Sequence, residues 1–348
     1  MIPETTTQVE SIEPISFTPS VESWRRELAD AFRRPAELLA HLGFSTTAIE
    51  NMTCSDQGFS TLVPRSYAAR MERSNPQDPL LLQVLPQKAE AFNAEGYHKD
   101  PLAEQTYNPV PGIIHKYDGR VLLLITGHCV INCRFCFRRH FPYHDNRRSR
   151  LQWQQSLTYV RDNPSIHEVI LSGGDPLAAT DSQLTDLFQQ LAAIPQLKRV
   201  RIHTRLPIIL PSRVTVDFCK ILRQLPLQVI IVTHANHASE LDHSVYSACQ
   251  MLRQHGVHLL NQSVLLRGIN DHHQSLAQLS ERLFACDILP YYLHMLDRVQ
   301  GTAHFYVDDT KAKDLLAGLQ ECLPGYLVPR LVREEAGASG KTMITSAS

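Results

Sequence analysis

Short apolar runs, most of them about 30 residues apart, recur along the chain from Val121 onward. They cover residues 121–126, 168–172, 199–204, 228–233, 257–264 and 288–294. Between them lie stretches with apolar residues at helical spacing, such as "DSQLTDLFQQLAAI" and "DHSVYSACQMLRQHG". Parallel strands buried on both faces have continuous apolar sequences, and each needs a crossover to reach the next strand. The pattern therefore predicts six β/α units, arranged either as a partial barrel or as an open doubly wound sheet.

The same patterning divides the chain into four segments. Residues 1–20 are polar and are predicted to form a flexible arm. Residues 21–110 are predicted to be a helical extension, because "ESWRRELADAFRRPAELLAHLG" has helically spaced apolar positions and ends at a glycine. The β/α units occupy residues 111–330, and residues 331–348 form a short C-terminal segment rich in Gly, Ala and Ser. Polar residues gather where the predicted strands end, which is the edge that carries the site in α/β folds.

The composition and charge of the chain indicate which kinds of binding partner it has. The 348 residues include 34 Lys and Arg and 35 Asp and Glu, so no overall positive field attracts nucleic acid. No apolar run approaches the length of a membrane span, and the polar N-terminus is unlike a secretory signal. We therefore expect a cytoplasmic protein with no nucleic-acid or membrane partner. In that compartment its eight cysteines indicate metal or redox chemistry rather than disulfides.

Three thiols lie in one loop directly after the first predicted strand. Cys129, Cys133 and Cys136 have the spacing Cys-x3-Cys-x2-Cys. Structural zinc normally takes four ligands, and no second cysteine pair exists to complete such a site. A fourth ligand could come only from a histidine nearby: His128, His140 or His144. A [4Fe–4S] cluster held by three thiolates would leave one iron free to bind a cofactor or a substrate, which is a catalytic arrangement.

Two other strand ends carry motifs that are weak by themselves. "SGGDPL", residues 172–177, follows the second predicted strand, and "THANH", residues 233–237, ends the fourth. The glycine pair could form a tight turn with an aspartate that caps the next helix, or it could let the backbone approach a ligand closely. The histidine of the second motif could contact a ligand or be a packed polar residue.

The cysteine loop resembles the signature of the radical S-adenosylmethionine (SAM) enzymes, including the aromatic Phe135 before the last cysteine. The resemblance implies a partial (β/α)6 barrel and a [4Fe–4S] cluster on Cys129, Cys133 and Cys136. It also implies that SAM binds the open iron and that a reductant such as flavodoxin or ferredoxin supplies an electron, which releases a 5′-deoxyadenosyl radical. The SAM contacts that it implies are Phe135, Ser172, Gly173, Gly174, Asp175, His234 and Asn236.

A closer resemblance, over roughly residues 95–345, is to the lysine 2,3-aminomutase family. It is carried by "RVLLLITGHCVINCRFCFRRHF", "VILSGGDPL", "THANH", "NQSVLLRGIND" and "HFYV…GYLVP". The family is an isomerase family that moves an amino group between adjacent carbons with SAM and pyridoxal 5′-phosphate (PLP). Lys341 alone would be taken for a solvated tail residue, but "GASGKT" matches the place of the family's PLP lysine. The other implied PLP contacts are Lys116, where the family tends to have Arg, Arg120 and Gln262.

The resemblance also implies how the substrate is held. Arg138 would bind the α-carboxylate of L-lysine, and a planar guanidinium suits a bidentate carboxylate contact. Asp297 and Glu334 would bind the distal ammonium. Glu334 stands where the longer enzymes of the family carry Asp, so we expect a pocket of different depth.

The chain ends at Ser348, without the C-terminal zinc cysteines of the longer enzymes, so we expect no zinc. This short form resembles the bacterial aminomutases that make (R)-β-lysine for elongation factor P, to which a lysyl-tRNA-synthetase-like ligase attaches it. One alternative is an aminomutase for another amino acid such as glutamate, or for free β-lysine. An alternative of another class is a non-catalytic iron–sulfur or zinc-binding protein.

Overall fold

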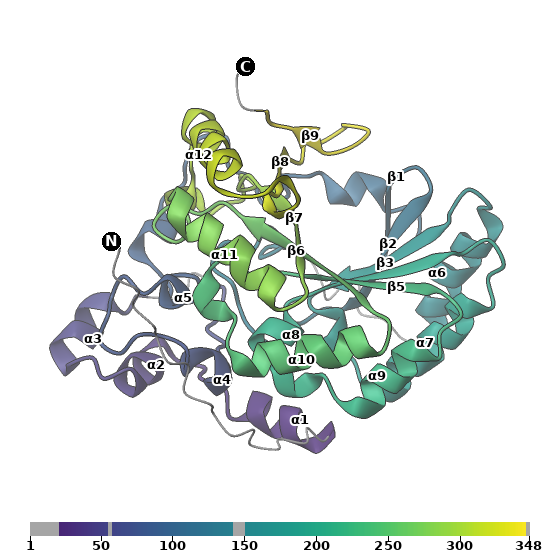
Figure 1. Ribbon diagram of the computed structural model, residues 1–348, viewed down its shortest axis with the longest axis horizontal. Coiled ribbons are helices and arrows are strands. Elements are labelled where there is room, and N and C mark those ends of the chain that lie inside the picture. Colours follow the sequence, from purple (N-terminus) through teal and green to yellow (C-terminus); the bar gives the residue numbers. More distant parts are fainter. Residues whose placement is uncertain (1–20, 55–57, 142–149, 346–348) are drawn as a thin grey trace, which may run out of the picture.

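The computed structural model describes residues 21–54, 58–141 and 150–345. Within them, the strands form one sheet of nine strands (Figure 1). The strands are β1 (Ile113–Tyr117), β2 (Arg120–Thr126), β3 (Glu168–Gly173), β4 (Arg199–Thr204), β5 (Gln228–Thr233), β6 (His258–Val264), β7 (Leu289–His294), β8 (Arg330–Arg333) and β9 (Thr342–Met343). They lie in the sheet in the same order as in the chain. The six predicted apolar runs correspond to β2 through β7.

Strands β2 through β8 are parallel, whereas β1 and β9 pair antiparallel at the two edges. Because the strand order never reverses, right-handed crossovers place the connecting helices on one face of the sheet. A doubly wound sheet would need a reversal of strand order. The structure therefore realises the partial-barrel alternative. The parallel strand β8 was not among the predicted runs.

The helices belong to two groups, one in the N-terminal extension and one along the barrel. The first group is α1 (Val21–Ala29), α2 (Pro35–His41), α3 (Thr46–Met52), α4 (Arg65–Ala68) and α5 (Pro79–Leu82). The second is α6 (Arg150–Asp162), α7 (Asp181–Ala192), α8 (Leu206–Ile209), α9 (Val216–Arg223), α10 (His243–Gln254), α11 (His273–Ala285) and α12 (Asp309–Cys322). None of the helices in the described residues is long and apolar enough to cross a membrane.

Side chains at helix starts explain where several crossovers begin. Thr180 accepts a hydrogen bond from the backbone of Gln183 at the start of α7, and Gln183 reciprocates in a capping box. Asp242 caps α10 in the same way through Val245 N. Such caps satisfy backbone donors that have no partner inside the helix. The caps fix where the loop before each helix ends, and these loops follow the carboxyl ends of the strands, where the site is expected.

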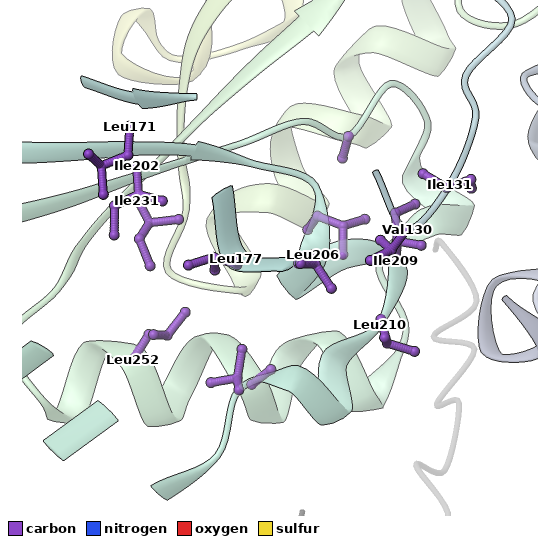
Figure 2. Packing of buried hydrophobic residues seen from close by; sticks show 14 of the residues in the cluster. Val130, Ile131, Leu171, Leu177, Ile202, Leu206, Ile209, Leu210, Ile231 and Leu252 are labelled. Atoms are coloured by element: carbon purple, nitrogen blue, oxygen red, sulfur yellow. The ribbon is translucent and has the colours of Figure 1, made fainter. Parts of the chain in front are cut away.

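The main core lies between the sheet and the surrounding helices. Figure 2 shows Leu171, Ile202 and Ile231 of the neighbouring strands β3, β4 and β5 side by side and facing Leu252 of α10. All four side chains are buried completely. The N-terminal extension contributes Trp24, Leu38, Tyr67 and Leu80 to the same core. The extension therefore packs as part of the barrel structure.

The extension also supports the loops that follow the strands. Arg70 of the segment after α4 donates to the backbone carbonyl of Ile209, and Gln83 after α5 donates to the carboxylate of Glu240. The cysteine loop is held in the same way, because Arg134 N donates to Gln83 O at 2.8 Å. The carboxyl end of the sheet is thus enclosed by segments that are far away in the sequence.

Candidate active site

The three cysteines follow β2 at the carboxyl edge of the sheet, in a half-buried loop. Desolvation, and then the neighbouring Cys133, raise the pKa of the Cys136 thiol to about 11. Desolvation also raises the pKa of Cys129, where the charge of Cys136 is the next cause. Three thiolates in this loop therefore destabilise one another unless a cation compensates them.

This donor set fits an iron–sulfur cluster. The three thiols do not converge on one point among the described residues, and a cluster does not require this because each thiolate binds a different iron. A coordinated metal deprotonates a thiol outright, so iron would remove the electrostatic conflict among Cys129, Cys133 and Cys136. These three residues would hold the cluster.

The glycine turn after β3 lies directly against the cysteine loop. Gly173 has a φ of +122°, and a Cβ on Gly174 would lie 2.2 Å from the carbonyl oxygen of His128. Side chains are therefore excluded here by backbone approach as well as by conformation. Asp175 caps the 3₁₀ turn Pro176–Ala178, as one of the two sequence interpretations has it. Its predicted contact with SAM stays a prediction.

The side chain of Asp175 is occupied by the protein. It accepts hydrogen bonds from the Thr204 hydroxyl at 2.6 Å and from Arg205 N at 2.8 Å. Asn236 is used in a similar way, because it bonds Gln83 Oε1 at 3.0 Å and Val264 N at 2.8 Å. Both side chains thus tie strand ends together. Contact of either residue with SAM would have to use backbone atoms or replace one of these bonds.

Three histidines lie at the carboxyl ends of the parallel strands β4, β5 and β7. His234 after β5 contacts Gln262 of β6, with 2.7 Å between His Nε2 and the amide nitrogen. Burial, and then the charge of Arg205, lower the pKa of His234 to about 3, so its ring is neutral. His203 on β4 and His294 on β7 each have a buried Nε2 atom with no hydrogen-bond partner in the described part of the chain. Unpaired buried polar atoms are costly, and a polar ligand between these strands would satisfy them.

His203 and His294 were not predicted from the sequence. Burial and then Arg201 lower the pKa of His203, with smaller contributions from Lys341 and Arg138. Burial and then Lys341 lower the pKa of His294 to about 3. Both rings therefore lie within reach of charges that the sequence assigns to PLP and substrate. The only available signal was their place as polar residues at the ends of apolar runs.

Glu334 connects the two edges of the sheet. It follows β8, and its carboxylate accepts the Lys341 ammonium at 2.6 Å, the Lys116 ammonium at 3.3 Å and the Tyr117 hydroxyl at 3.1 Å. Burial would raise the pKa of this carboxyl, but the charge of Lys341 lowers it to about 2. Arg120 joins the group through its guanidinium, which lies 4.7 Å from the centre of the Tyr117 ring. The residues predicted for PLP at the two edges are therefore brought together.

Asp297 is the other acid of this region. Its half-buried carboxylate has no hydrogen-bond partner among the described residues. Desolvation, followed by the charge of Glu334, raises the pKa of Asp297 to about 7. Glu104 also contributes to this rise. Asp297 thus lies where a cation would be strongly stabilised.

Arg138, the predicted carboxylate ligand, is buried and already holds a carboxylate. Its Nε and Nη2 atoms donate to the two oxygens of Glu104 at 2.8 and 2.7 Å, and Nη1 donates to Ser172 Oγ at 2.9 Å. Phe135, a predicted SAM contact, packs edge-on against Phe305, with 6.4 Å between the two ring centres. Glu104 was not predicted, because it lies in an isolated 3₁₀ turn, Glu104–Tyr107, without periodic pattern.

Comparison with known proteins decides the family. The sequence pattern of the Radical SAM superfamily matches residues 123–279. The chain is 48% identical to the L-lysine 2,3-aminomutase of Escherichia coli K12 over 93% of this chain and 95% of the relative. It is 34% identical to that of Clostridium subterminale over 92% of this chain and 77% of the relative. The chain belongs to the lysine 2,3-aminomutase family of radical SAM enzymes.

Membership makes the protein an isomerase and implies a [4Fe–4S] cluster, SAM and PLP. These are the cofactors that the sequence resemblance implied, and the predicted radical SAM partial barrel is confirmed as well. The structure of a radical SAM methyltransferase from Sphaerobacter thermophilus is 13% identical, with a TM-score of 0.45 over 64% of this chain and 68% of the other. It is too distant to bear on the site. The residue assignments therefore depend on the geometry described above.

Proposed function

We propose that the protein converts L-lysine to (R)-β-lysine. The observation that carries the proposal is the hydrogen bond from the Lys341 ammonium to Glu334, beside the unpaired carboxylate of Asp297. A lysine side chain ends in the same primary ammonium as the substrate, so the site already binds the group that it would have to recognise. The relatives named L-lysine 2,3-aminomutase support the same substrate.

The acid pair explains why a distal ammonium would be preferred. A buried ammonium that faces carboxylates is compensated, whereas a buried carboxylate facing them is not. Asp297 has its pKa raised to about 7 chiefly by desolvation, which shows how poorly water compensates charge at this point. Lysine brings the missing cation, and glutamate would add a third anion near Asp297 and Glu334.

Arg138 would bind the other end of the substrate. Its bidentate contact with Glu104 supports this assignment, because a guanidinium binds a substrate carboxylate in the same geometry. The α-carboxylate of lysine would bind beside Glu104 or in its place. Both Arg138 and Lys341 act on the pKa of His203, which supports a single site between the two ends.

The residues around Lys341 fit PLP. Lys341 would carry it, and Lys116, Arg120 and Gln262 would contact it. Lys341 and Lys116 both pair with Glu334, and Arg120 lies over the ring of Tyr117 beside them. With the cluster and SAM bound, the site would supply the radical that removes a hydrogen atom from the substrate and the pyridine ring that carries the migrating nitrogen. The protein groups would hold lysine at both ends and exclude water meanwhile.

We further propose that the product serves elongation factor P through a lysyl-tRNA-synthetase-like ligase, with flavodoxin or ferredoxin as reductant. Support comes from the resemblance to the short-form aminomutases and from the identity to relatives, which is 48% for the Escherichia coli protein and 34% for the clostridial one. Intact-mass measurement of the factor from a strain that lacks this gene tests the link. We expect the factor to lack β-lysine, and an unchanged mass would contradict this role.

The substrate assignment has its own test. Anaerobically reconstituted enzyme with SAM, PLP and dithionite should convert L-lysine to β-lysine, as measured by chromatography of the products. Glutamate in the same assay should give no β-amino acid. Preference for glutamate would refute the assignment without affecting the family membership.

A further inference from the structure

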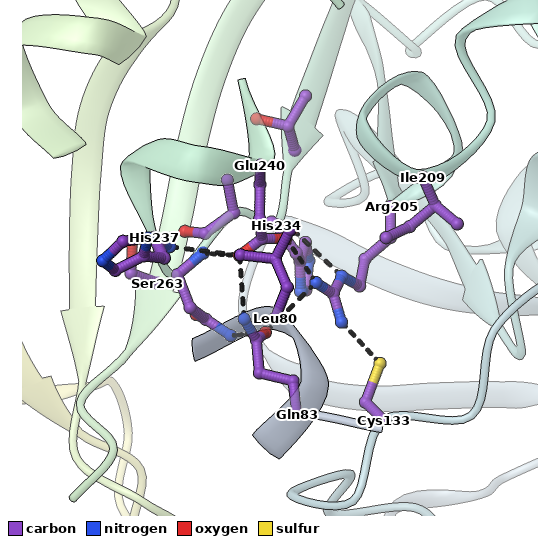
Figure 3. A network of polar contacts seen from close by, with 12 residues as sticks. Leu80, Gln83, Cys133, Arg205, Ile209, His234, His237, Glu240 and Ser263 are labelled. Carbon is purple, nitrogen blue, oxygen red and sulfur yellow. Dashed lines mark hydrogen bonds and ion pairs between the residues drawn. The ribbon is translucent and has the colours of Figure 1, made fainter. Parts of the chain in front are cut away.

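A buried arginine contacts one of the three cluster cysteines. Arg205 directly follows β4, and its Nη1 atom lies 2.6 Å from the Sγ atom of Cys133 (Figure 3). The two residues are 72 positions apart in the chain. Arg205 is not part of the cysteine motif and is none of the residues proposed to bind the cluster, SAM, PLP or the substrate. The contact therefore needs an explanation of its own.

The guanidinium is fixed on every side. Its Nε atom donates to the carbonyl oxygen of His234 at 3.1 Å, and its Nη2 atom donates to Glu240 Oε2 at 2.6 Å and to Gln83 Oε1 at 3.3 Å. Figure 3 shows these partners converging on Arg205 from the β5 loop and the N-terminal extension. Because Arg205 is buried, this geometry holds the N–H group on the sulfur without competition from water.

Glu240 compensates the charge of Arg205 from the far side. It is fully buried, and its Oε1 atom accepts hydrogen bonds from Asn236 N at 2.7 Å and His237 N at 3.1 Å. The arginine and the glutamate together carry no net charge. The cation is nevertheless the member that touches Cys133, so the field at the sulfur is positive.

Hydrogen bonds and nearby charges at the sulfur ligands set the potentials of iron–sulfur clusters. Reduction transfers one electron from a low-potential donor of the flavodoxin or ferredoxin kind into the cluster, and no bond in the protein forms or breaks. The added negative charge is stabilised by a cation and an N–H donor at a ligating thiolate. We propose that Arg205 is a positioning residue that raises the reduction potential of the cluster through Cys133, and that Glu240 limits this rise. The inference rests on the cluster of the proposed function.

Two variants shift the potential in opposite directions if the interaction is electrostatic. Arg205→Gln removes the cation, so the reduced cluster is less stable and the potential becomes more negative. Glu240→Gln removes the compensating anion and leaves Arg205 in place, so the potential becomes more positive. We expect the ratio of reduced to oxidised cluster at a fixed potential to change at least tenfold in Arg205→Gln, which is about 59 mV for one electron.

The experiment is a redox titration of reconstituted protein without SAM, followed by electron paramagnetic resonance, with iron content measured in parallel. Arg205→Lys keeps the charge and should shift the potential less than Arg205→Gln. Arg213→Gln is the matched control, because Arg213 is also a buried arginine but pairs with Asp181. Its potential should equal that of the wild type.

Shifts of opposite sign in Arg205→Gln and Glu240→Gln would support the proposal. Wild-type potentials in both variants, or shifts in the same direction, would overturn it. Loss of iron from Arg205→Gln and Arg205→Lys alike, with full iron in Arg213→Gln, would also overturn it in favour of a structural role. Failure of the wild type itself to bind iron would refute the cluster assignment instead.

Discussion

Lys341 donates its ammonium to Glu334 at 2.6 Å, although the sequence resemblance assigns the lysine to PLP and the glutamate to the substrate. The two roles are compatible, because the nitrogen of Lys341 would be bonded to PLP once the cofactor is bound and would no longer donate to Glu334 as an ammonium. Glu334 would then keep Lys116 at 3.3 Å and have one oxygen free for an ammonium from the substrate. Loading of the cofactor would thus open the subsite for the substrate.

Lys341→Ala should remove PLP from the protein and leave iron content unchanged. Lys341 lies beside Glu334 and Tyr292, and no hydrogen bond or ion pair joins it to the cysteine loop in the described part of the chain. Borohydride reduction followed by peptide mass spectrometry locates the pyridoxyl group in the wild type. Lys311→Ala is the control, since Lys311 pairs with Asp271 on a different part of the surface. A pyridoxyl group on another lysine of the wild type would contradict the assignment.

Replacing Cys129, Cys133 or Cys136 by Ala should abolish the cluster in each case. With three thiolates available, loss of any one leaves two irons without a protein ligand. Iron and sulfide analysis after anaerobic reconstitution measures the effect. Cys322→Ala, which alters an exposed thiol at the end of α12, should retain full iron content. Equal cluster content in all four variants would eliminate the cluster assignment.

Arg138→Lys should raise the KM for lysine by about ten- to a hundredfold, because an ammonium cannot reproduce a bidentate carboxylate contact worth about 1.5–3 kcal/mol. The new ammonium can still pair with Glu104, so the fold should persist. Steady-state kinetics with thermal unfolding in parallel measure both effects. Arg199→Lys is the matched control. Arg199 begins β4 and pairs with Glu168, so this ion pair lies at the amino ends of the strands, away from the site at their carboxyl ends. Equal KM values in Arg138→Lys and wild type would exclude Arg138 as the carboxylate ligand.

The barrel could be predicted because its strands are apolar runs at regular intervals. Strand β8 was not predicted, because its sequence "RLVR" has a charged residue at each end and only two apolar residues, which is too short for a recognisable run. The antiparallel strand β9 has two residues and depends on pairing between Val332 and Met343. Such edges are determined by tertiary pairing, which no local pattern records.

In the site, too, the local features could be predicted from the sequence and the long-range contacts could not. The cysteine spacing is local, so the loop was found at once. The contacts of Arg138 with Glu104 and of Arg205 with Cys133 join residues 34 and 72 positions apart, and they exist only after the barrel has formed. Asp175 shows the converse, because its motif was recognised while its carboxylate turned out to be occupied by Thr204 and Arg205.

Asp297 should make lysine binding depend on pH. Its pKa is raised from the ordinary value of 3.8 to about 7, first by desolvation and then by the charge of Glu334. The carboxyl is therefore neutral below about pH 7 and becomes an anion above it. Because the ammonium of lysine binds the anion, the KM for lysine should fall as the pH rises toward 7 and level off above it. The profile of kcat/KM against pH measures this.

Asp297→Asn removes both the charge and its titration. A buried ammonium that loses one partner of an ion pair typically loses about 3–5 kcal/mol, so kcat/KM should drop by roughly two to four powers of ten. The pH dependence near 7 should disappear at the same time. The fold should not suffer, because an acid whose folded pKa is raised opposes folding once the pH exceeds 3.8, and the amide has no such cost. Glu334→Asp, which keeps the charge, should retain the pH profile and most of the activity. Full activity in Asp297→Asn, or an unchanged pH profile, would exclude this carboxylate from recognition of the ammonium.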